Sequence, residues 1–339
     1  MVLNTEKLKR FNVDLIRTAI KSKGTATKSN ISFATGLSIA TCNNILNELI
    51  VTGEVQEIEE AESTGGRPSK KFIYNKNFIY IAALYGRIEK GEKSIHCSVF
   101  NMSGESVYDK SEIFPEISVD ELVSVIKEIL TKFDKIKVVS LGVPGIVRKG
   151  VIGLCELEKL SHSHMKRHLE KKFNKIFTIS NDVNCAALGY YHSIKNKSLE
   201  SLVYMYYAED GLSGAGIIIN GRILQGSRDF AGEISFLPLG VKIEKQGQIQ
   251  KNQKKFLDLV NRTVQSVTCI INPEYIVISG HWFTDEMKEQ LLELINKTSP
   301  IDQISQIIFE SGIHKSYLKG LYIAAIQNLH CGFEVISTR

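Results

Sequence analysis

Apolar residues recur at helical spacing in three short segments near the start of the chain. These segments are residues 12–22, 29–34 and 39–51, and their periodicity predicts three amphipathic helices. Between the second and third helix lies Thr35-Gly36-Leu37-Ser38, which suits a tight turn because glycine tolerates left-handed backbone and Ser38 is a favourable N-cap. Three short helices with a glycine-containing turn before the last predict a helix-turn-helix.

The outer side of the predicted third helix is small and polar. It carries Thr41, Asn43 and Asn44, side chains that can hydrogen-bond base edges or phosphates, and asparagine can pair bidentately with adenine. The first residues of such a helix lie nearest the bases in the major groove. The candidate DNA-contacting residues are Lys28, Ser29, Ser38, Thr41, Asn43, Asn44, Arg67 and Lys70.

A hairpin is predicted after the third helix. Residues 54–58 and 71–74 are expected to be its strands, and Gly65-Gly66-Arg67-Pro68 lies in the connection between them. We expect Arg67, held out by the following proline, to enter a narrow minor groove. The alternative is a surface hairpin with solvated charges.

The remaining 260 or so residues alternate between strand and helix patterns. This order predicts an α/β fold with two sheet blocks, and hence two lobes with a cleft. Asn220-Gly221 predicts a hairpin turn, residues 242–255 an exposed loop, and residues 275–278 the last strand. The other expected strands are 78–84, 94–100, 137–141, 177–180, 202–206 and 216–219, and the expected helices are 120–133, 185–193 and 256–271.

Charge and cysteine content restrict the function only slightly. The 339 residues carry a formal net charge of +5, and residues 1–75 hold ten Lys and Arg against eight Asp and Glu, so DNA binding must depend on the placement of charge. The six cysteines form no C-x-x-C pair, so their spacing does not suit zinc ligands. We expect them to be reduced thiols. The N-terminus lacks an apolar secretory segment, and a cytoplasmic location is expected.

Ordered motifs identify a resemblance to the ROK family of transcriptional repressors, the group related to xylose and N-acetylglucosamine repressors. Residues 12–75 resemble the winged-helix domain of these repressors, and residues 76–339 resemble their sugar-kinase-like, actin-like ATPase domain. The motifs of the first part are Leu15-Ile16, Thr35-Gly36-Leu37-Ser38, Asn47-Glu48-Leu49-Ile50 and Gly65-Gly66-Arg67-Pro68. Those of the second part are Gly142-Val143-Pro144-Gly145, the run from Asn181 to Gly189, Ile219-Asn220-Gly221, Gly226, Gly232-Glu233-Ile234, Asn272-Pro273 and Ser279-Gly280.

The resemblance implies a division into domains. A winged helix-turn-helix is expected over residues 1–75, and an effector and dimerisation domain over residues 76–339. Within the latter, lobe one is expected over about 76–183 with the C-terminal helix at about 315–339, and lobe two over about 184–314.

The parts that a ROK sugar kinase needs are damaged. The family's first phosphate loop, D-x-G-G-T, falls on Ala83-Leu84-Tyr85-Gly86-Arg87, where the acid is missing and Tyr85 replaces a glycine. The second loop falls on residues 210–216, where Asp210 places a negative charge beside the expected phosphate. Phe236 replaces the family's zinc-site histidine, and no cysteine follows between Leu237 and Leu259. We therefore expect no kinase activity, no cofactor and no metal.

The sugar-contacting set is partly retained. The resemblance implies that Gly145, Asn181, Asp182, Glu233 and Phe236 form an effector site, with Asp182 corresponding to the general base of the kinases. A binding protein can keep Asp182 to recognise a sugar hydroxyl. The alternative is a vestigial site whose residues only satisfy local hydrogen bonds. We expect His162, His164 and His168 to lie in a solvated loop and the helix that follows it rather than to bind a metal ion. A further hypothesis is that His162 or His164 contacts the ligand.

Together these features predict a repressor of carbohydrate genes that forms a homodimer or a dimer of dimers. It is expected to bind a palindromic double-stranded operator and a sugar or sugar phosphate effector, without membrane association. Two alternatives remain open at this stage: a ligand-independent DNA-binding protein with a degenerate scaffold, and a residual sugar kinase.

Overall fold

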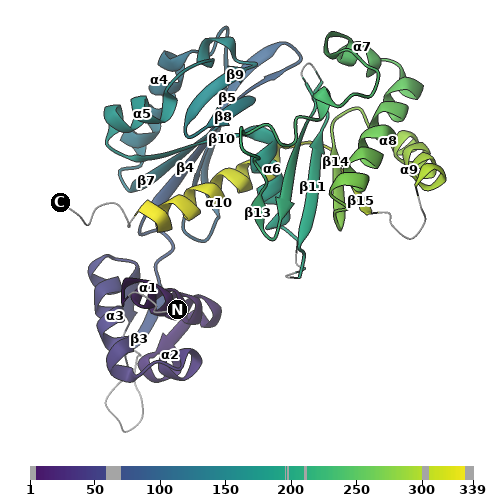
Figure 1. The fold of residues 1–339 in the computed structure, drawn as a ribbon. Helices are drawn as coiled ribbons and strands as arrows, with labels where there is room; N and C mark the ends of the chain where they lie inside the picture. The colour runs from purple at the N-terminus through teal and green to yellow at the C-terminus, as the bar shows by residue number, and fades with distance from the viewer. Residues whose placement is uncertain are drawn as a thin grey trace. The chain divides into compact units, whose positions relative to one another are not determined.

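The computed structural model of the chain divides into two compact units (Figure 1). The first comprises Met1–Ile79 with Asn101–Ser103, and the second comprises Tyr80–Phe100 with Gly104–Arg339. The structure describes residues 5–58, 70–194, 196, 198–209, 212–299 and 305–332. The domain and lobe boundaries expected from the resemblance stay predictions.

The first unit consists of three helices packed on a small antiparallel sheet. The helices are α1 (Thr5–Lys23), α2 (Lys28–Thr35) and α3 (Ile39–Val51), which confirms the three predicted helices and extends the first. The sheet has the order β1-β3-β2, with β1 at Thr25–Thr27, β2 at Val55–Ile58 and β3 at Lys71–Tyr74. Its core is apolar, and the fully buried side chains include Ile16, Ile20, Ile31, Leu46 and Phe72.

Caps fix the turn between α2 and α3. Thr27 and Asn30 form a capping box at the start of α2, and Gly36 ends that helix with a φ of 71°, a conformation that favours glycine. The Ser38 side chain accepts a hydrogen bond from the Thr41 backbone N–H and so begins α3. The predicted helix-turn-helix is confirmed, and α3 is oriented by its N-terminal cap.

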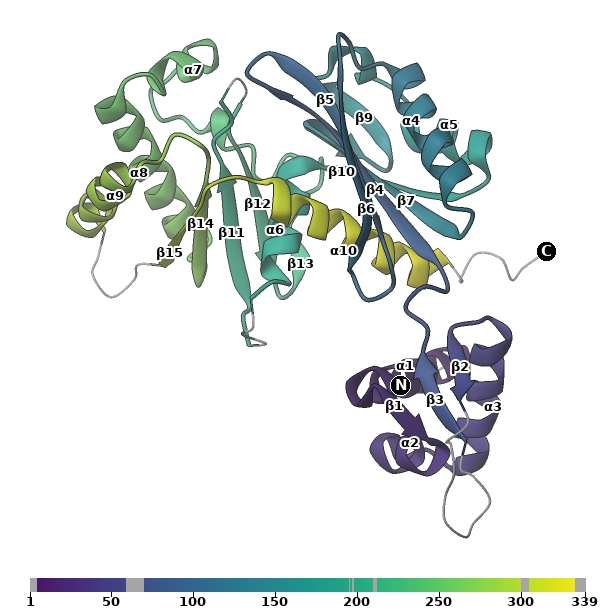
Figure 2. The ribbon, with the colours of Figure 1, turned by 180° about the vertical axis from the view of Figure 1, so that it is seen from behind.

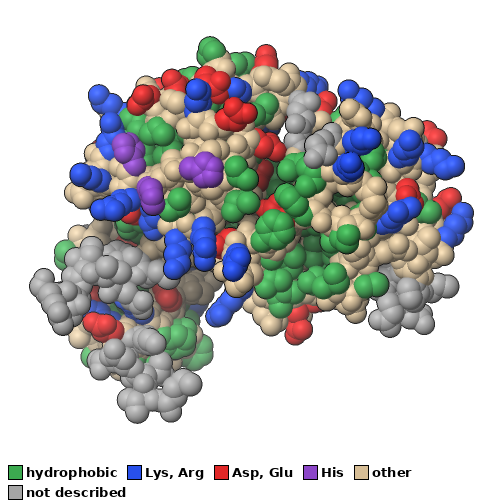
Figure 3. Space-filling model, turned by 45° about the horizontal axis from the view of Figure 1, so that its top comes forward, with side chains coloured by type: hydrophobic (Ala, Val, Ile, Leu, Met, Phe, Trp, Pro, Cys, Tyr) green, Lys and Arg blue, Asp and Glu red, His purple; other side chains and the backbone are tan. Residues whose placement is uncertain are grey.

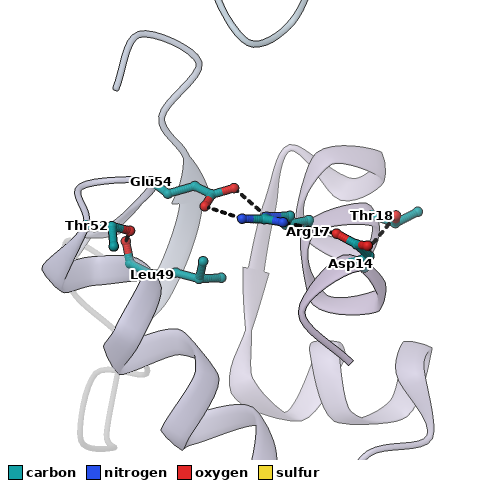
Figure 4. Close-up of polar contacts among 6 residues, drawn as sticks. All are labelled: Asp14, Arg17, Thr18, Leu49, Thr52 and Glu54. Atoms are coloured by element: carbon teal, nitrogen blue, oxygen red, sulfur yellow. Dashed lines mark hydrogen bonds and ion pairs between the residues drawn. The ribbon is translucent and has the colours of Figure 1, made fainter. Parts of the chain in front are cut away.

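A bidentate ion pair joins α1 to Glu54, which directly precedes β2 (Figure 4). The Arg17 guanidinium donates through Nε to Glu54 Oε1 at 2.6 Å and through Nη2 to Glu54 Oε2 at 2.8 Å. Arg17 also donates to Asp14 at 3.0 Å. Glu54 is only 3% exposed, so removing Arg17 alone would leave a buried charge without its partner. This pair holds α1 against the sheet that supports α3.

The second unit contains two five-stranded sheets with the same topology. The first has the order β10-β7-β4-β5-β6 and the second β13-β12-β11-β14-β15. In each, three consecutive antiparallel strands are followed by two parallel ones. The strands are β4 (Tyr80–Glu89), β5 (Glu92–Phe100), β6 (Ser106–Phe114), β7 (Ile136–Val143), β10 (Ile176–Asn181), β11 (Ser201–Tyr206), β12 (Gly214–Ile219), β13 (Arg222–Ile223), β14 (Tyr275–Ser279) and β15 (Gln306–Glu310).

Helices cover the outer faces of both sheets and fill the space between them (Figures 1 and 2). α4 (Val119–Lys132) and α5 (Met165–Phe173) pack on the first sheet, and α8 (Gln253–Ile270) and α9 (Asp285–Thr298) pack on the second. α6 (Asp182–Tyr191) and α10 (His314–Gly332) lie side by side between the sheets. Their close crossing depends on Gly189 and Gly320, because a Cβ at either would meet backbone atoms of the other helix at 1.9 and 1.8 Å.

Shorter elements complete the unit and correct two predictions. β8 (Gly145–Arg148) and β9 (Val151–Cys155) form a hairpin, and η1 (Glu158–Leu160), η2 (Ile234–Phe236), η3 (Ile243–Lys245) and α7 (Gln246–Ile249) are single turns. Residues 242–255 were expected to be an exposed loop, which is wrong because Gln246 and Gln250 are buried and donate to the carbonyls of Ser235 and Ala208. Residues 275–278 were expected to be the last strand, but β15 follows and pairs parallel to β14.

Candidate nucleic-acid interface and sugar site

The predicted DNA-contacting residues of α2 and α3 lie close together. Lys28 Nζ donates to Asn43 Oδ1 at 2.5 Å, which links the start of α2 to α3. The hydroxyls of Ser38 and Thr41 lie 2.9 Å apart at the start of α3, and Asn44 is exposed one position beyond Asn43. The first turns of α3 therefore present adjacent hydroxyl and amide groups.

Apolar side chains also lie on the surface of these two helices, which sequence reasoning missed. Ile39 at the start of α3 is 56% exposed, and Phe33 on α2 is 91% exposed. Two large apolar side chains are thus exposed on the helix-turn-helix. Periodicity assigned only the buried side of each helix, so it gave no signal for these two.

The other predicted DNA contacts have mixed positions. Ser29 is exposed near the start of α2, while Lys70 forms an ion pair with Glu57 of β2. Arg67 and the predicted wing tip lie outside the described residues. Their roles stay predictions.

Three predicted sugar-site residues meet at the start of α6. Asn181 is the N-cap of α6, and its side chain accepts from the Asn184 backbone N–H. Asn181 Nδ2 donates to the Gly145 carbonyl at 3.0 Å and to Asp182 Oδ1 at 2.9 Å. The Val183 N–H donates to the same Asp182 oxygen. These bonds fix the Asp182 carboxyl beside the β8–β9 hairpin.

Negative charge gathers around Asp182. Burial, together with repulsion from the carboxylates of Glu156 and Glu233, raises the pKa of Asp182 to about 7. Burial also raises the pKa of Glu233. Glu156 was missed by the sequence analysis because it belongs to no motif; it follows β9 and accepts from the Leu212 N–H at 3.3 Å. The site therefore disfavours a bound anion next to Asp182.

Phe236 is the exposed part of this region. It ends η2, is 49% exposed, and contacts Phe230 edge-on with ring centroids 5.3 Å apart. Phe230 is likewise 50% exposed. Two half-exposed aromatic rings close to Glu233 offer an apolar surface of the kind that sugar faces contact.

The expected position of the first phosphate loop is an ordinary paired strand. Ala83, Tyr85 and Arg87 pair with Ser98, His96 and Ser94 along β4 and β5. Tyr85 is 1% exposed, and its hydroxyl hydrogen-bonds His314 Nδ1 at the start of α10. Its ring lies 4.5 Å from that of Tyr317, centroid to centroid. Aromatic packing of Tyr85 therefore occupies the place of the first loop glycine, and Gly86 beside it is part of the paired strand.

The second phosphate loop is described only in part. Asp210 and Gly211 lie outside the described residues, whereas Gly214 and Gly216 are found in β12. A Cβ on Gly216 would meet the Val183 carbonyl at 2.6 Å, so this glycine permits close packing of β12 on α6.

The histidines near α5 lie on the surface. His162, His164 and His168 are exposed, and histidine side chains gather on this part of the molecule (Figure 3). Among the described residues, His, Cys, Asp and Glu side chains form no group of three or more suited to a metal ion. Within the same residues, no helix is both long and apolar enough to cross a membrane.

Comparison with known proteins places the chain in one family. Residues 85–249 match the model of the ROK family. The chain is 29% identical to the xylose repressor of Caldicellulosiruptor bescii, over 68% of this chain and 59% of that protein. It is 23% identical to the DNA-binding transcriptional dual regulator NagC of Escherichia coli, over 70% of this chain and 60% of that protein. The chain spans about 60% of the length of these curated relatives.

Solved structures support the fold. A crystal structure of a ROK family transcriptional regulator, a homolog of E. coli MLC protein, matches with a TM-score of 0.68 at 18% identity, covering 94% of this chain and 96% of that one. Sugar kinases are also among the similar proteins. Residues 85–249 thus match the ROK family, and the chain as a whole shares the fold of a ROK family transcriptional regulator.

Proposed function

We propose that this protein is a DNA-binding transcriptional regulator, acting as a repressor of carbohydrate genes and responding to a sugar. One observation carries the proposal: a helix-turn-helix shares the chain with a kinase-like unit whose first phosphate-loop position is a paired strand, filled by Tyr85. The repressor relatives support the same reading.

The helix-turn-helix supplies the DNA contact. Ser38, Thr41 and Asn44 offer hydrogen-bonding groups at the end of α3 that lies nearest the bases in such complexes. Ile39, exposed between them, adds an apolar contact of the kind that thymine methyl groups receive. Two such heads in a homodimer suit a palindromic operator.

The sugar site supplies the response. Asn181, Asp182 and Glu233 can hydrogen-bond sugar hydroxyls, and Phe236 can cover an apolar sugar face. Because two further carboxyl groups, those of Glu156 and Glu233, lie close enough to repel charge on Asp182, we propose a neutral sugar rather than a sugar phosphate at this position. A sugar that binds one conformer better shifts the population and with it the DNA affinity.

The direct test selects operator DNA from a random pool with the purified full-length chain and measures binding by gel shift. Asn44→Ala should weaken binding to the selected operator by about 1–3 kcal/mol, the value of a bidentate base contact. Asn47→Ala is the matched control, because it lies one turn further from the start of α3 and is exposed. Failure to select any DNA sequence would contradict the proposal.

Ligand response separates the remaining possibilities. A neutral sugar should raise the melting temperature of the chain and change operator affinity together. If no sugar in a broad panel does either while DNA binding persists, the protein is a ligand-independent DNA-binding protein. ADP formation from ATP and a sugar in a coupled assay would instead establish a residual kinase.

A further inference from the structure

A polar hollow lies in the second unit, outside the candidate sugar site. It has a volume of about 460 Å³ and is formed by the turn of the β8–β9 hairpin, the start of α5, strand β10 and the segment around residues 225–229. None of Gly145, Asn181, Asp182, Glu233 or Phe236 lines it. Its size suits a small-molecule ligand.

Positive charge predominates in the hollow. Arg148, Lys149 and Lys166 line it, against a single carboxylate, Asp229. Arg148 Nε lies 3.3 Å from Asp229 Oδ2, and Lys166 Nζ lies 3.8 Å from Glu170 on the same helix. Lys149 is exposed and has no ion pair within the part of the chain that the structure describes. The hollow therefore has a net positive lining, opposite to the acidic surroundings of Asp182.

The hairpin turn holds Lys149 in an unfavourable conformation. Lys149 and Gly150 connect Arg148 to Val151 as a two-residue turn, with φ values of 50° and 78°. Asparagine, aspartate or glycine is preferred at the first position of such a turn, and a lysine there costs free energy. From this turn, Lys149 lines the hollow.

The same turn packs against Lys166. The Lys166 N–H donates to the Gly150 carbonyl at 3.0 Å, and a Cβ on Gly150 would meet Lys166 Cβ at 2.5 Å. Glycine at position 150 thus brings the two lysines to the same side of the hollow. Hydroxyl and amide groups complete the lining, including Ser180, Ser227, Gln225 and Asn328.

We propose that this hollow is a second ligand site, which binds the phosphate group of a small phosphorylated molecule. Lysine ammonium groups and the arginine guanidinium bind phosphate oxygens, and the hydroxyl and amide groups suit the remaining oxygens or a sugar attached to the phosphate. A regulator with this site senses a neutral sugar near Asp182 and a phosphorylated compound here.

The test measures melting temperature and isothermal titration of the full chain with inorganic phosphate, glucose 6-phosphate, glucose and sodium chloride at matched ionic strength. Phosphate-bearing probes should bind and raise the melting temperature, and sodium chloride should not. Binding of inorganic phosphate would show that phosphate alone suffices. Binding of glucose 6-phosphate alone would show that the attached sugar is also recognised.

Variants place the binding in this hollow. Lys149→Gln and Lys166→Gln should each weaken phosphate binding by roughly tenfold or more, the loss expected for one charged hydrogen bond. Lys171→Gln on the same helix, away from the hollow, is the matched control and should leave binding unchanged. Asp182→Asn should also leave it unchanged, which separates this site from the proposed sugar site. Equal phosphate binding by the double variant Lys149→Gln/Lys166→Gln, or an equal response to sodium chloride, would overturn the proposal.

Discussion

Tyr85 and Phe236 are both aromatic residues at positions where the resemblance to sugar kinases places a glycine and a histidine, yet their surroundings differ. Tyr85 is 1% exposed and packs against Tyr317 and His314, whereas Phe236 is 49% exposed and contacts the ring of Phe230. A buried ring closes a site by becoming part of the core. An exposed ring changes which ligand fits. Under the roles that the resemblance implies, we propose that Tyr85 closes the first phosphate loop and that Phe236 alters the sugar side.

The largest effect is expected from removing the buried ring. Tyr85→Ala should lower the free energy of unfolding by about 3–5 kcal/mol, the usual cost of deleting a core aromatic side chain, and should not create ATP hydrolysis. Urea denaturation measures the first and a coupled ADP assay the second. If Tyr85 merely blocks a competent nucleotide site, the variant would gain ATP-dependent activity instead.

Two controls sharpen this result. Tyr108→Ala removes a half-buried tyrosine from β6 and should cost less. Tyr85→Phe deletes only the hydroxyl that bonds His314 and should cost about 0.5–1.5 kcal/mol.

The next largest effect is on the pH dependence of the unfolding free energy, to which the Asp182 carboxyl contributes. The pKa of Asp182 is raised to about 7 in the folded chain, whereas an unfolded chain has it near 4. Between these values the folded state holds the proton more tightly, so stability falls as pH rises, by at most about 1.4 kcal/mol per pH unit. Asp182→Asn should flatten this part of the profile, and its unfolding free energy at pH 8 should exceed that of the parent chain.

The measurement is denaturant unfolding at a series of pH values. A profile unchanged by Asp182→Asn would show that the carboxyl titrates normally. The same variant should lose the response to a neutral sugar, because a charged hydrogen-bond acceptor is gone.

A smaller effect is expected from the exposed ring. Phe236→Ala should change the unfolding free energy by less than about 0.5 kcal/mol, since the side chain is half-exposed. It should weaken sugar binding by roughly tenfold, which corresponds to about 1.4 kcal/mol. Phe11→Ala on α1, also exposed, is the matched control and should leave sugar binding unchanged. If Phe236→Ala lost as much unfolding free energy as Tyr85→Ala, the distinction between an exposed ring at position 236 and a core ring at position 85 would be wrong.

The sequence predicted both substitutions but not their surroundings. Aligning strands was enough to show that Tyr85 replaces a loop glycine, because the motif is local. Its partners Tyr317 and His314 lie on α10, at the other end of the chain, and no local pattern connects them to β4. Glu156 escaped notice for the same reason, since its effect on Asp182 depends on the β8–β9 hairpin.

The fold was predictable where periodicity was strong. The helices over 39–51, 120–133 and 256–271 correspond to α3, α4 and α8 within two residues at each end except for the start of α8. Short strands were missed: β1 has three residues and β13 two, too few for alternation to be seen. β15 was missed as well, although it completes the parallel part of the second sheet.

The smallest expected effect distinguishes the two causes of the Asp182 shift. Glu156→Gln removes a neighbouring negative charge but keeps an acceptor oxygen for the Leu212 N–H. The pKa of Asp182 should therefore fall, and the pH at which stability stops declining should move to a lower value, without the flattening caused by Asp182→Asn. Glu158→Gln, exposed two residues away, is the control. An unmoved profile would mean that Glu156 does not act on the Asp182 carboxyl and would leave burial and Glu233 as the causes of the raised pKa. A shifted profile would show that the carboxylates around Asp182 interact, in contrast to the packed rings around Tyr85.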